Sequence, residues 1–367
     1  MLAKPKILIV TAAFGEGHNS AARNLSLALN EQGAQTHVAD PFILSAPHST
    51  SAIQWGYRLV TTHFPRIWQK IYQATDQCDL SKPNLPLSRG PEGFLQSLVE
   101  EFKPTAIVST YPLYPYFLER IFMETGKKIP LSTVVTDSIE INASWLRAPT
   151  DYFLVSDQAT LETMRCWGIP AHKLIDTGFP VNPSFRTLRP VPAEDPCKPF
   201  RILYFPTPKK PYIRRHSRAL LNASPDVELT IVMGKSLRLL YSRAKEIKDA
   251  YPGRVRLLGW TKKVPELLNQ HHLVVGKAGG ATVHEAIAAR CPMLIHHLVP
   301  GQEEGNLKLL QQLGAGDLAE TPQDLTQSVC HILANNSAKW RKMKAALINH
   351  NRNDGAITAA SFILSQV

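Results

Sequence analysis

The sequence lacks several features that would assign a chain to a familiar class. No apolar run among its 367 residues approaches the roughly 18–20 residues that a membrane-spanning helix requires. Its five cysteines are widely separated and include no Cys-x-x-Cys pair, which argues against a disulfide framework and a zinc site. No Asp-x-Asp motif, internal repeat or low-complexity tract is present either. We therefore predict no tightly bound catalytic metal.

The start of the chain is also unlike a secretion signal. Lys4 and Lys6 precede a short apolar run, Ile7–Val10, which leads directly into a glycine-containing loop. We interpret this run as the first strand of a domain. The expected location of the protein is therefore the cytoplasm.

Charge is distributed unevenly along the chain. Residues 1–183 carry 15 Lys and Arg against 16 Asp and Glu, whereas the remainder carries 26 against 14. Segment 198–263 alone holds 16 basic and 4 acidic residues. Such a field favours anionic partners such as phosphates and acidic lipid headgroups, although a solvated basic face would have the same composition. Because the segment lacks the interleaved aromatic residues of a stacking surface, we predict no nucleic-acid partner.

Short β-rich runs alternate with helical segments, a pattern typical of parallel α/β sheets. The alternation stops at a proline-rich stretch after Gly178 and restarts at Arg201, and closely spaced prolines disfavour helices and central strands. The prediction is an α/β fold of two Rossmann-like domains, 1–183 and 184–340, followed by a C-terminal helix at 341–367 that crosses back to the first domain. The expected strands are 6–12, 36–39, 106–110, 132–136 and 152–155 in the first domain, and 201–205, 229–233, 255–258, 273–276 and 292–296 in the second.

A glycine-containing loop, Phe14–His18, separates the first expected strand from the first expected helix. Glycines such as Gly17 allow a ligand to approach the backbone closely, and amides at the start of a helix favour negative charge. His18 is a candidate general base or phosphate contact, because neutral imidazole is available near pH 7. A tight turn with a capping histidine is the alternative interpretation.

Two later segments carry more information. In Val275–Glu285 a buried strand leads through a pair of glycines into a helix with Glu285 in an early turn, which points amides at a diphosphate and a carboxylate at ribose hydroxyls. Glu285 could instead only stabilise the helix dipole. Val299–Asn306 places amides and carboxylates after the next strand, where they suit a polyhydroxylated sugar or form a structural polar loop.

These two segments together resemble the donor-sugar half of family 28 glycosyltransferases. The similarity is greatest to the branch of monogalactosyldiacylglycerol synthases and processive diacylglycerol glucosyltransferases. Lys277–Glu285 resembles the family's Lys-Pro-Gly-Gly-x-Thr-x-x-Glu motif, with Ala278 in place of proline, and Pro300–Asn306 resembles its Pro-Gly-Gln-Glu-x-x-Asn motif. The resemblance extends from residue 6 to about residue 318. It implies a GT-B fold, in which two Rossmann-like domains face a cleft.

The resemblance also implies a reaction, the inverting transfer of a hexose from a UDP-sugar to a lipid hydroxyl, with diacylglycerol as the expected acceptor. UDP-sugar is then a substrate, and no cofactor is expected. His18 or Asp137 is the candidate base, and these residues alone leave the choice open. The residues expected to hold the UDP-sugar are Gly17, Val264, Gly279, Gly280, Ala281, Thr282, Glu285, Gln302, Glu303 and Asn306.

Two positions depart from the family pattern. Asn142 stands where the family has a histidine, and asparagine cannot titrate. The loop Pro206–Pro211 has prolines where a glycine-rich turn is expected, although Lys209 and Lys210 could supply charge in place of amides. Two alternatives therefore stay open: a nucleotide-sugar-binding protein that has lost catalysis, and a transferase for another acceptor of the lipid-linked muramyl type.

Residues 54–72 interleave aromatic and basic side chains, among them Trp55, Phe64 and Arg66. Such a mixture suits a membrane interface, where rings lie at headgroup depth and cations meet anionic lipids. We predict peripheral contact with the anionic inner face of the cell membrane. The alternative is an amphipathic helix packed on its own domain, and Pro65 argues against one continuous helix.

Overall fold

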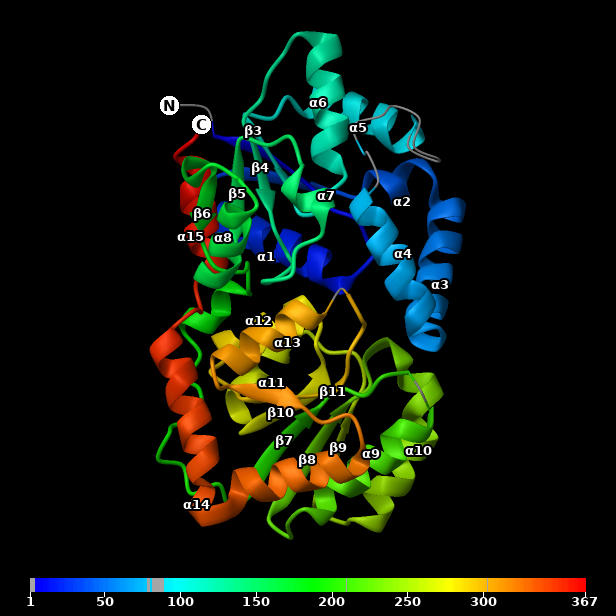
Figure 1. Cartoon of the computed structure of the whole chain (residues 1–367), viewed down its shortest axis with the longest axis vertical. Coiled ribbons are helices and arrows are strands. Elements are labelled where there is room, and N and C mark those ends of the chain that lie inside the picture. Colours follow the sequence, from blue (N-terminus) through cyan, green and yellow to red (C-terminus); the bar gives the residue numbers. More distant parts are fainter. Residues whose placement is uncertain (1–3, 78–79, 81–88, 209, 302) are drawn as a thin grey trace. The chain divides into compact units, whose positions relative to one another are not determined.

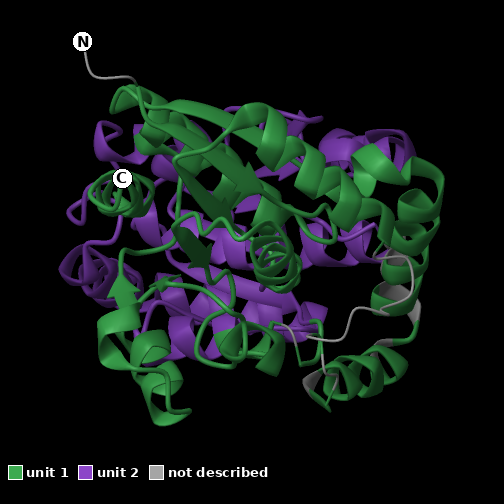
Figure 2. Cartoon of the chain, turned by 90° about the horizontal axis from the view of Figure 1, so that it is seen from above, with its two compact units in different colours: residues 1–183, 299–305, 354–367 green, residues 184–298, 306–353 purple. Residues whose placement is uncertain are grey.

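The computed structural model describes residues 4–77, 80, 89–208, 210–301 and 303–367. The chain divides into two compact units, which Figure 2 distinguishes by colour. Unit 1 comprises residues 1–183, 299–305 and 354–367, and unit 2 comprises residues 184–298 and 306–353. Each unit contains a six-stranded sheet whose neighbouring strands are parallel (Figure 1). The predicted α/β fold with two Rossmann-like sheets is therefore confirmed.

The sheet of unit 1 has the strand order β2-β1-β3-β4-β5-β6, and that of unit 2 has the order β12-β11-β10-β7-β8-β9. The strands of unit 1 are β1 (Lys6–Val10), β2 (Gln35–Ala39), β3 (Ala106–Ser109), β4 (Leu131–Val134), β5 (Tyr152–Val155) and β6 (Leu174–Asp176). Those of unit 2 are β7 (Phe200–Tyr204), β8 (Val227–Val232), β9 (Val255–Leu258), β10 (Leu273–Lys277), β11 (Met293–His297) and β12 (Gly316–Leu318). The edge strands β6 and β12 were not predicted, because three residues are too few to show a periodic pattern.

Helices connect the strands in both units. Unit 1 contains α1 (Glu16–Glu31), α2 (Pro41–Ser45), α3 (Pro47–His63), α4 (Pro65–Gln77), α5 (Arg89–Phe102), α6 (Tyr114–Thr125), α7 (Ala143–Leu146), α8 (Gln158–Cys166) and α15 (Gly355–Leu364). Unit 2 contains α9 (Lys210–Asn222), α10 (Leu237–Ala250), α11 (Val264–Gln270), α12 (Gly280–Ala288), most of α13 (Glu304–Gln312) and all of α14 (Pro322–His350). As expected from Pro65, the aromatic segment is not one helix, because α3 and α4 are separated at Phe64.

The C-terminal segment contains two helices where the sequence indicates one. α14 ends at His350, because the next residue, Asn351, has a left-handed φ of 47° and stops the helix. The chain then forms α15, which packs beside α1 in unit 1 (Figure 1). A Cβ on Gly355 would lie 2.1 Å from the carbonyl oxygen of Phe179, so only glycine permits this approach.

Helix α1, which packs beside α15, is held in place by its buried apolar face. Its buried face includes Leu25 and Leu29, both fully buried, and burying each leucine stabilises the fold by roughly 1.5–3 kcal/mol. Asn24 adds a hydrogen bond to the carbonyl oxygen of Pro180, 3.0 Å away. The position of the helix start, where His18 lies, is therefore set by the core.

The strand register of unit 1 brings three loops to one edge of the sheet. Val10 of β1 pairs with Ser109 of β3, and Ser109 in turn pairs with Thr133 of β4. Parallel strands in this register end side by side, so the residues that follow β1, β3 and β4 are neighbours. This edge carries the first candidate site.

Candidate functional site

His18 lies in the first turn of α1 with only 9% of its surface exposed. Its Nδ1 atom is 2.8 Å from the carbonyl oxygen of Thr110 and 2.9 Å from Oγ1 of Thr136. A carbonyl oxygen can only accept, so Nδ1 carries the proton and Nε2 keeps its lone pair. No described residue forms a hydrogen bond with Nε2, and this lone pair is therefore the one available to a ligand.

Burial determines the charge of His18. It lowers the pKa of the imidazole to about 4, and the hydrogen bond to Thr110 offsets only part of this shift. The ring is therefore neutral at pH 7. It has the orientation and protonation state of a hydrogen-bond acceptor, as a general base requires.

Asp137 follows β4 and lines the same cavity as His18. Its Oδ2 atom accepts a hydrogen bond from Nε1 of Trp145, 2.9 Å away. Burial raises the pKa of Asp137 to about 7, although the bond from Trp145 acts in the opposite direction. The ring of Trp145 also lies 6.0 Å from that of His18, so this buried tryptophan links the two candidate bases.

The cavity that contains both residues has a volume of about 520 Å³ and is formed entirely by unit 1. This volume is within the usual range for small-molecule sites. His18, Asp137, Asn142, Ser144 and Thr75 provide its polar groups. Its apolar and aromatic wall consists of Phe14, Phe42, Ile53, Tyr57, Val60, Trp68, Ile71, Tyr72, Leu80, Tyr111, Pro112, Leu113 and Trp145. An apolar ligand with one reactive polar end fits this arrangement.

Asn142, the first departure from the family pattern, has a structural role here. Its side-chain oxygen accepts a hydrogen bond from the amide of Ser144, 3.0 Å away, and so caps α7, which carries Trp145. Its amide donates to Oγ1 of Thr75 on α4 at 3.0 Å. Asn142 therefore positions two walls of the cavity without a titrating group.

The raised pKa of Asp137 predicts a pH-dependent loss of stability. The folded protein retains this proton up to about pH 7, whereas an aspartate in the unfolded chain loses it near pH 3.8, so the free energy of unfolding falls as the pH rises between these values. This difference in pKa lowers the free energy of unfolding by at most about 4 kcal/mol, and contact of the carboxylate with solvent in the cavity reduces the effect. We expect Asp137→Asn to raise Tm at pH 8 relative to the wild type, and to leave Tm nearly unchanged at pH 4. An equal change in Tm at both pH values would contradict this prediction.

Unit 2 carries the second part of the predicted site, at the carboxyl end of β10. Gly279 is the N-cap of α12, and the first intrahelical bond runs from the amide of Val283 to its carbonyl oxygen. The amides of Gly280, Ala281 and Thr282 precede this bond and have no acceptor within the helix. All of them are half-buried, as is Glu285 one turn later. These amides can bind an anion such as a diphosphate.

Two other predicted donor contacts also lie in unit 2. Val264 is the first residue of α11, and it is half-buried. Asn306 is buried, and its amide donates to the carbonyl oxygen of Ala278, 2.9 Å away, in the turn before α12. Asn306 therefore orients the glycine turn, while its Oδ1 atom has no partner among the described residues.

The segment Val299–Gly305 belongs to unit 1. Glu303 is 5% exposed, and its carboxylate accepts a hydrogen bond from the amide of Val299 at 3.1 Å, so part of its role is to close the loop. Gln302 lies outside the described residues. Gly17, the other predicted contact in unit 1, is half-buried in the first turn of α1 beside His18.

The loop after β7, where prolines replace the expected glycines, leads into α9, which begins at Lys210. Lys209 lies outside the described residues. Thr207 is buried with a hydroxyl that has no described partner, and the same holds for Nδ1 of His296 at the end of β11. Unpaired polar atoms therefore remain at the carboxyl edge of this sheet, where α/β proteins bind ligands.

One side-chain cluster has the composition of a metal site. Atoms of Asp195, Cys197 and His272 lie within 4.8 Å of one another. The backbone amide of Arg201 donates to Nδ1 of His272 at 2.9 Å, so Nε2 carries the proton and donates to Oδ1 of Asp195 at 2.8 Å. This cluster fits a hydrogen-bonded pair better than a metal site, which would need a free Nε2 lone pair. The expected lack of a catalytic metal stays a prediction.

Sequence reasoning missed Thr110 and Tyr111, which lie directly after β3. Thr110 fixes the tautomer of His18, and the ring of Tyr111 packs at 5.2 Å against that imidazole. A usable signal was present, because both lie at the carboxyl end of the predicted strand 106–110, and α/β proteins bind ligands at that edge. A sequence without an alignment does not show which of several such loops faces the site.

Comparisons with known proteins show what the chain is similar to. Residues 18–181 match the family described as monogalactosyldiacylglycerol (MGDG) synthase. A processive diacylglycerol beta-glucosyltransferase of Bacillus cereus (strain 03BB102) is 24% identical over 374 residues, covering 100% of this chain and 95% of the relative. A second, from B. cereus strain B4264, is 25% identical over 359 residues, covering 95% of this chain and 90% of the relative.

Among solved structures, MurG of Acinetobacter baumannii superimposes with a TM-score of 0.63 at 16% identity, covering 99% of this chain and 100% of that one. This likeness confirms the predicted GT-B fold. The MGDG synthase match and the two B. cereus relatives confirm the resemblance inferred from the motifs, so the chain is similar along its whole length to glycosyltransferases of the MGDG synthase and processive diacylglycerol glucosyltransferase group.

Proposed function

We propose that this protein is an inverting hexosyltransferase that moves a sugar from a UDP-sugar to the hydroxyl of a lipid, with diacylglycerol as the expected acceptor. The observation that carries the proposal is the cavity of unit 1, which is apolar along its wall and ends on His18 and Asp137. The named activity of the B. cereus relatives supports the same chemistry.

His18 is the proposed general base. Nδ1 donates its proton to the carbonyl oxygen of Thr110, so Nε2 accepts the proton of the acceptor hydroxyl. The hydroxyl oxygen then forms a bond to the anomeric carbon, while the bond from that carbon to the diphosphate breaks and the electron pair leaves with UDP. Attack opposite the leaving group inverts the anomeric centre. Asp137, with a pKa of about 7, is the alternative base.

The donor is proposed to bind through unit 2. Free amides at the start of α12 suit the diphosphate, and Glu285 suits the ribose hydroxyls. A S. aureus MnaA structure with UDP, which has a TM-score of 0.60 at 12% identity and covers 100% of this chain and 98% of that one, supports a UDP-sized ligand on this fold. Because Asn306 holds the turn before α12, its contribution to donor binding is indirect.

Membrane contact is the proposed route to the lipid. Among the helices in the described part of the chain, none has both the length and the apolar character needed to cross a bilayer. Trp55 of α3, Phe64 between the two helices and Ile67 of α4 are 67%, 49% and 53% exposed. Ile53 and Ile71 are 41% and 43% exposed and also line the cavity, so the exposed apolar surface is continuous with the cavity wall. A lipid acceptor could enter the cavity from a membrane on that side.

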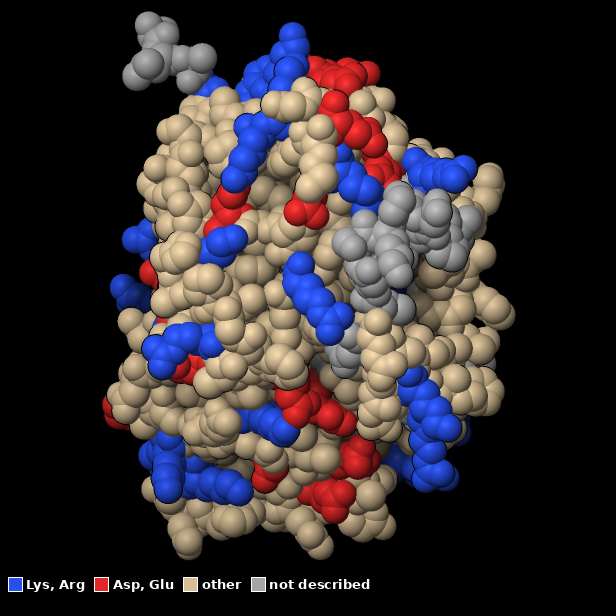
Figure 3. All heavy atoms as spheres, turned by 45° about the horizontal axis from the view of Figure 1, so that its top comes forward, with Lys and Arg blue, Asp and Glu red and all other residues tan. Residues whose placement is uncertain are grey.

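One face of the molecule (Figure 3) can be examined for the basic stripe that a nucleic-acid partner would favour. On the face drawn in Figure 3, basic and acidic side chains are interspersed among uncharged ones, without a continuous basic stripe. A nucleic-acid interface would favour such a stripe.

Replacing the most exposed aromatic residue of α3 tests membrane contact. We expect Trp55→Glu to weaken co-sedimentation with anionic vesicles by about tenfold or more, because it removes a ring from the interface and adds a negative charge. Trp167→Glu is the matched control, since Trp167 is 69% exposed outside the cavity wall. Equal vesicle binding by both variants would contradict membrane contact through Trp55.

Release of UDP from a panel of UDP-sugars, in the presence of vesicles containing diacylglycerol, tests the whole proposal. We expect acceptor-dependent release with one donor and a loss of at least about tenfold in Glu285→Ala, because a hydrogen bond to a charged group is lost. Glu320→Ala, at an exposed position, is the control.

The outcome also separates the alternatives. UDP binding without turnover on any acceptor would indicate a nucleotide-sugar-binding protein. Release only with a lipid-linked muramyl acceptor would change the acceptor and leave the reaction class intact. No UDP binding would contradict the proposal at its donor site.

A further inference from the structure

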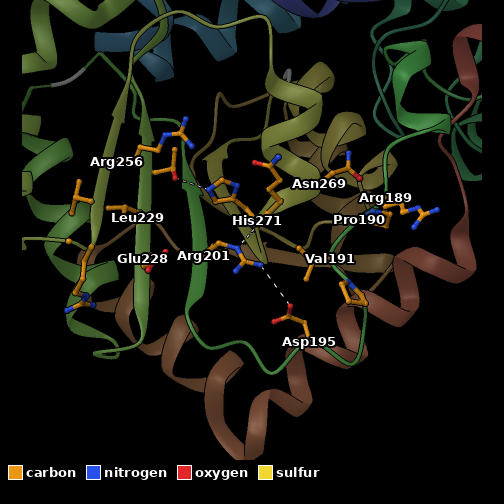
Figure 4. Close-up of a pocket in the computed structure, with 16 residues that line it drawn as sticks. Arg189, Pro190, Val191, Asp195, Arg201, Glu228, Leu229, Arg256, Asn269 and His271 are labelled. Atoms are coloured by element: carbon orange, nitrogen blue, oxygen red, sulfur yellow. Dashed lines mark hydrogen bonds and ion pairs between the residues drawn. The ribbon is translucent and has the colours of Figure 1, made fainter.

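A second cavity lies in unit 2, at the edge of the sheet opposite to α12. It has a volume of about 570 Å³ and is lined by the first residues of β7, β8 and β9, by the end of α11 and by the segment 189–195 (Figure 4). The glycine turn before α12 follows the carboxyl end of β10, whereas this cavity lies at amino ends. The predicted donor contacts therefore do not use it.

Arg201, the second residue of β7, lies in the middle of the cavity lining (Figure 4). Its Nε atom donates to the carbonyl oxygen of Gln270 at 2.8 Å, and its Nη2 atom lies 4.0 Å from Oδ2 of Asp195. Its side chain is 34% exposed. The hydrogen bond to Gln270 already fixes the guanidinium group, so little conformational entropy of this side chain would be lost when a ligand binds.

The carboxylate of Asp195 is already hydrogen-bonded to other groups. It accepts hydrogen bonds from Nε2 of His272 and from the amide of Cys197, both at 2.8 Å. Although burial acts in the other direction, these bonds and the nearby Arg201 lower the pKa of Asp195. Asp195 is therefore a distant partner for Arg201, whose Nη atoms form no hydrogen bond with a described residue.

Two further guanidinium groups flank Arg201. Arg189 and Arg256 lie on opposite sides of it in the view of Figure 4, and neither forms a hydrogen bond or ion pair with a described residue. A fourth, Arg254, is bonded to three backbone carbonyl groups and contributes charge alone. Burial lowers the pKa of His271 to about 4, and the fields of Arg201 and Arg256 add to the shift, so both charges act on the same imidazole.

Hydrogen-bond acceptors lie on the same face of the sheet. Glu228 of β8 pairs in register with Arg201, and Thr230 pairs with Arg256, so their side chains point to one face. Asn269 donates its amide to the carbonyl oxygen of Pro265, 2.8 Å away, which leaves Oδ1 as an acceptor. A carboxylate and an amide oxygen can accept hydrogen bonds from hydroxyl groups.

We propose that this cavity, whose lining includes the guanidinium groups of Arg201, Arg189 and Arg256 and the acceptors of Glu228 and Asn269, binds a small phosphorylated polyol. Planar guanidinium groups recognise the phosphate, and the acceptors recognise the hydroxyl groups. The source of such a ligand is either a soluble polyol phosphate or the phosphate headgroup of a lipid. The inference is independent of the proposed transferase reaction, because it uses the opposite edge of the sheet.

Calorimetric titration of the full chain with glycerol 3-phosphate and with inorganic phosphate tests this site. We expect glycerol 3-phosphate to bind more tightly than phosphate, and Arg256→Ala to weaken both by about tenfold through the loss of a charged hydrogen bond. Arg218→Ala, an exposed position on α9 outside the cavity, should bind as the wild type does. The wild type, Arg256→Ala and Arg218→Ala should bind UDP with equal affinity, and this result would separate the cavity from the donor site.

Vesicles distinguish the two sources of phosphate. Saturable binding of glycerol 3-phosphate that Arg256→Ala weakens supports a soluble ligand. Binding only to phosphatidylcholine vesicles that contain phosphatidic acid, again weakened by Arg256→Ala, supports a lipid headgroup. Equal affinities in Arg256→Ala and Arg218→Ala, or no saturable binding to any of these probes, would overturn the proposal.

Discussion

Replacing His18 by alanine is expected to lower kcat for acceptor-dependent UDP release by about 10²–10⁴-fold, the usual contribution of general base catalysis. The imidazole is held by Thr110 and Thr136 with its unprotonated nitrogen available to a ligand. Without it, the acceptor hydroxyl must lose its proton to water or to Asp137. KM for the donor should change little, because His18 lies in unit 1 and the proposed diphosphate contacts lie in unit 2.

Two controls separate a chemical role from a structural one. His18→Asn keeps a donor for the carbonyl of Thr110 but has no base, so it should be nearly as inactive as the alanine variant. His172→Ala removes an exposed histidine from the same unit and should retain full activity. Activity within about threefold of the wild type in His18→Asn would contradict the assignment, because a base is expected to contribute far more.

The pH profile decides between the two candidate bases. A base acts only in its unprotonated form, so kcat/KM falls as the pH drops through its pKa. With His18, whose pKa is about 4, we expect kcat/KM to stay level from pH 8 to about pH 5 and to fall only below that. A fall near pH 7 would instead identify Asp137.

Replacing Gly305 by alanine is expected to have the second-largest effect. A Cβ there would lie 1.7 Å from the carbonyl oxygen of Ser138 and 2.7 Å from the amide nitrogen of Glu140, both within unit 1. Backbone atoms cannot rotate away as a side chain can, so the segment 299–305 must move. We expect the free energy of unfolding to fall by about 3 kcal/mol and UDP release to fall more than about tenfold. Thermal unfolding and the release assay measure the two effects.

Gly93→Ala is the matched control for this substitution. Gly93 lies inside α5, and a Cβ there would meet no heavy atom within 4 Å. Alanine also favours the helix over glycine by about 0.5–1 kcal/mol, so this variant should be slightly more stable and fully active. A Gly305→Ala protein as stable and active as Gly93→Ala would show that the segment tolerates displacement.

The donor motif shows which structural features can be predicted from residues that are adjacent in the sequence. The diglycine turn and the helix with an early glutamate were predicted from Val275–Glu285, and the structure has β10, a turn and α12 at these positions. Residues adjacent in sequence determine such a strand–turn–helix unit, because its geometry depends on backbone conformation and short-range hydrogen bonds. The role of Asn306 was not predictable in the same way, since its partner Ala278 is 28 residues away.

The sequence alone therefore determined the α/β class, the place where the strand–helix alternation stops and restarts, and the loops that end at the carboxyl edges of strands. Periodicity, glycine and proline carry this information locally. Only the tertiary structure decided the tautomer of His18, the pKa values of His18 and Asp137, and the capping role of Asn142. Those properties depend on burial and on hydrogen-bond partners, of which Thr110 and Thr136 are 92 and 118 residues from His18. A single sequence does not show which distant groups folding brings into contact.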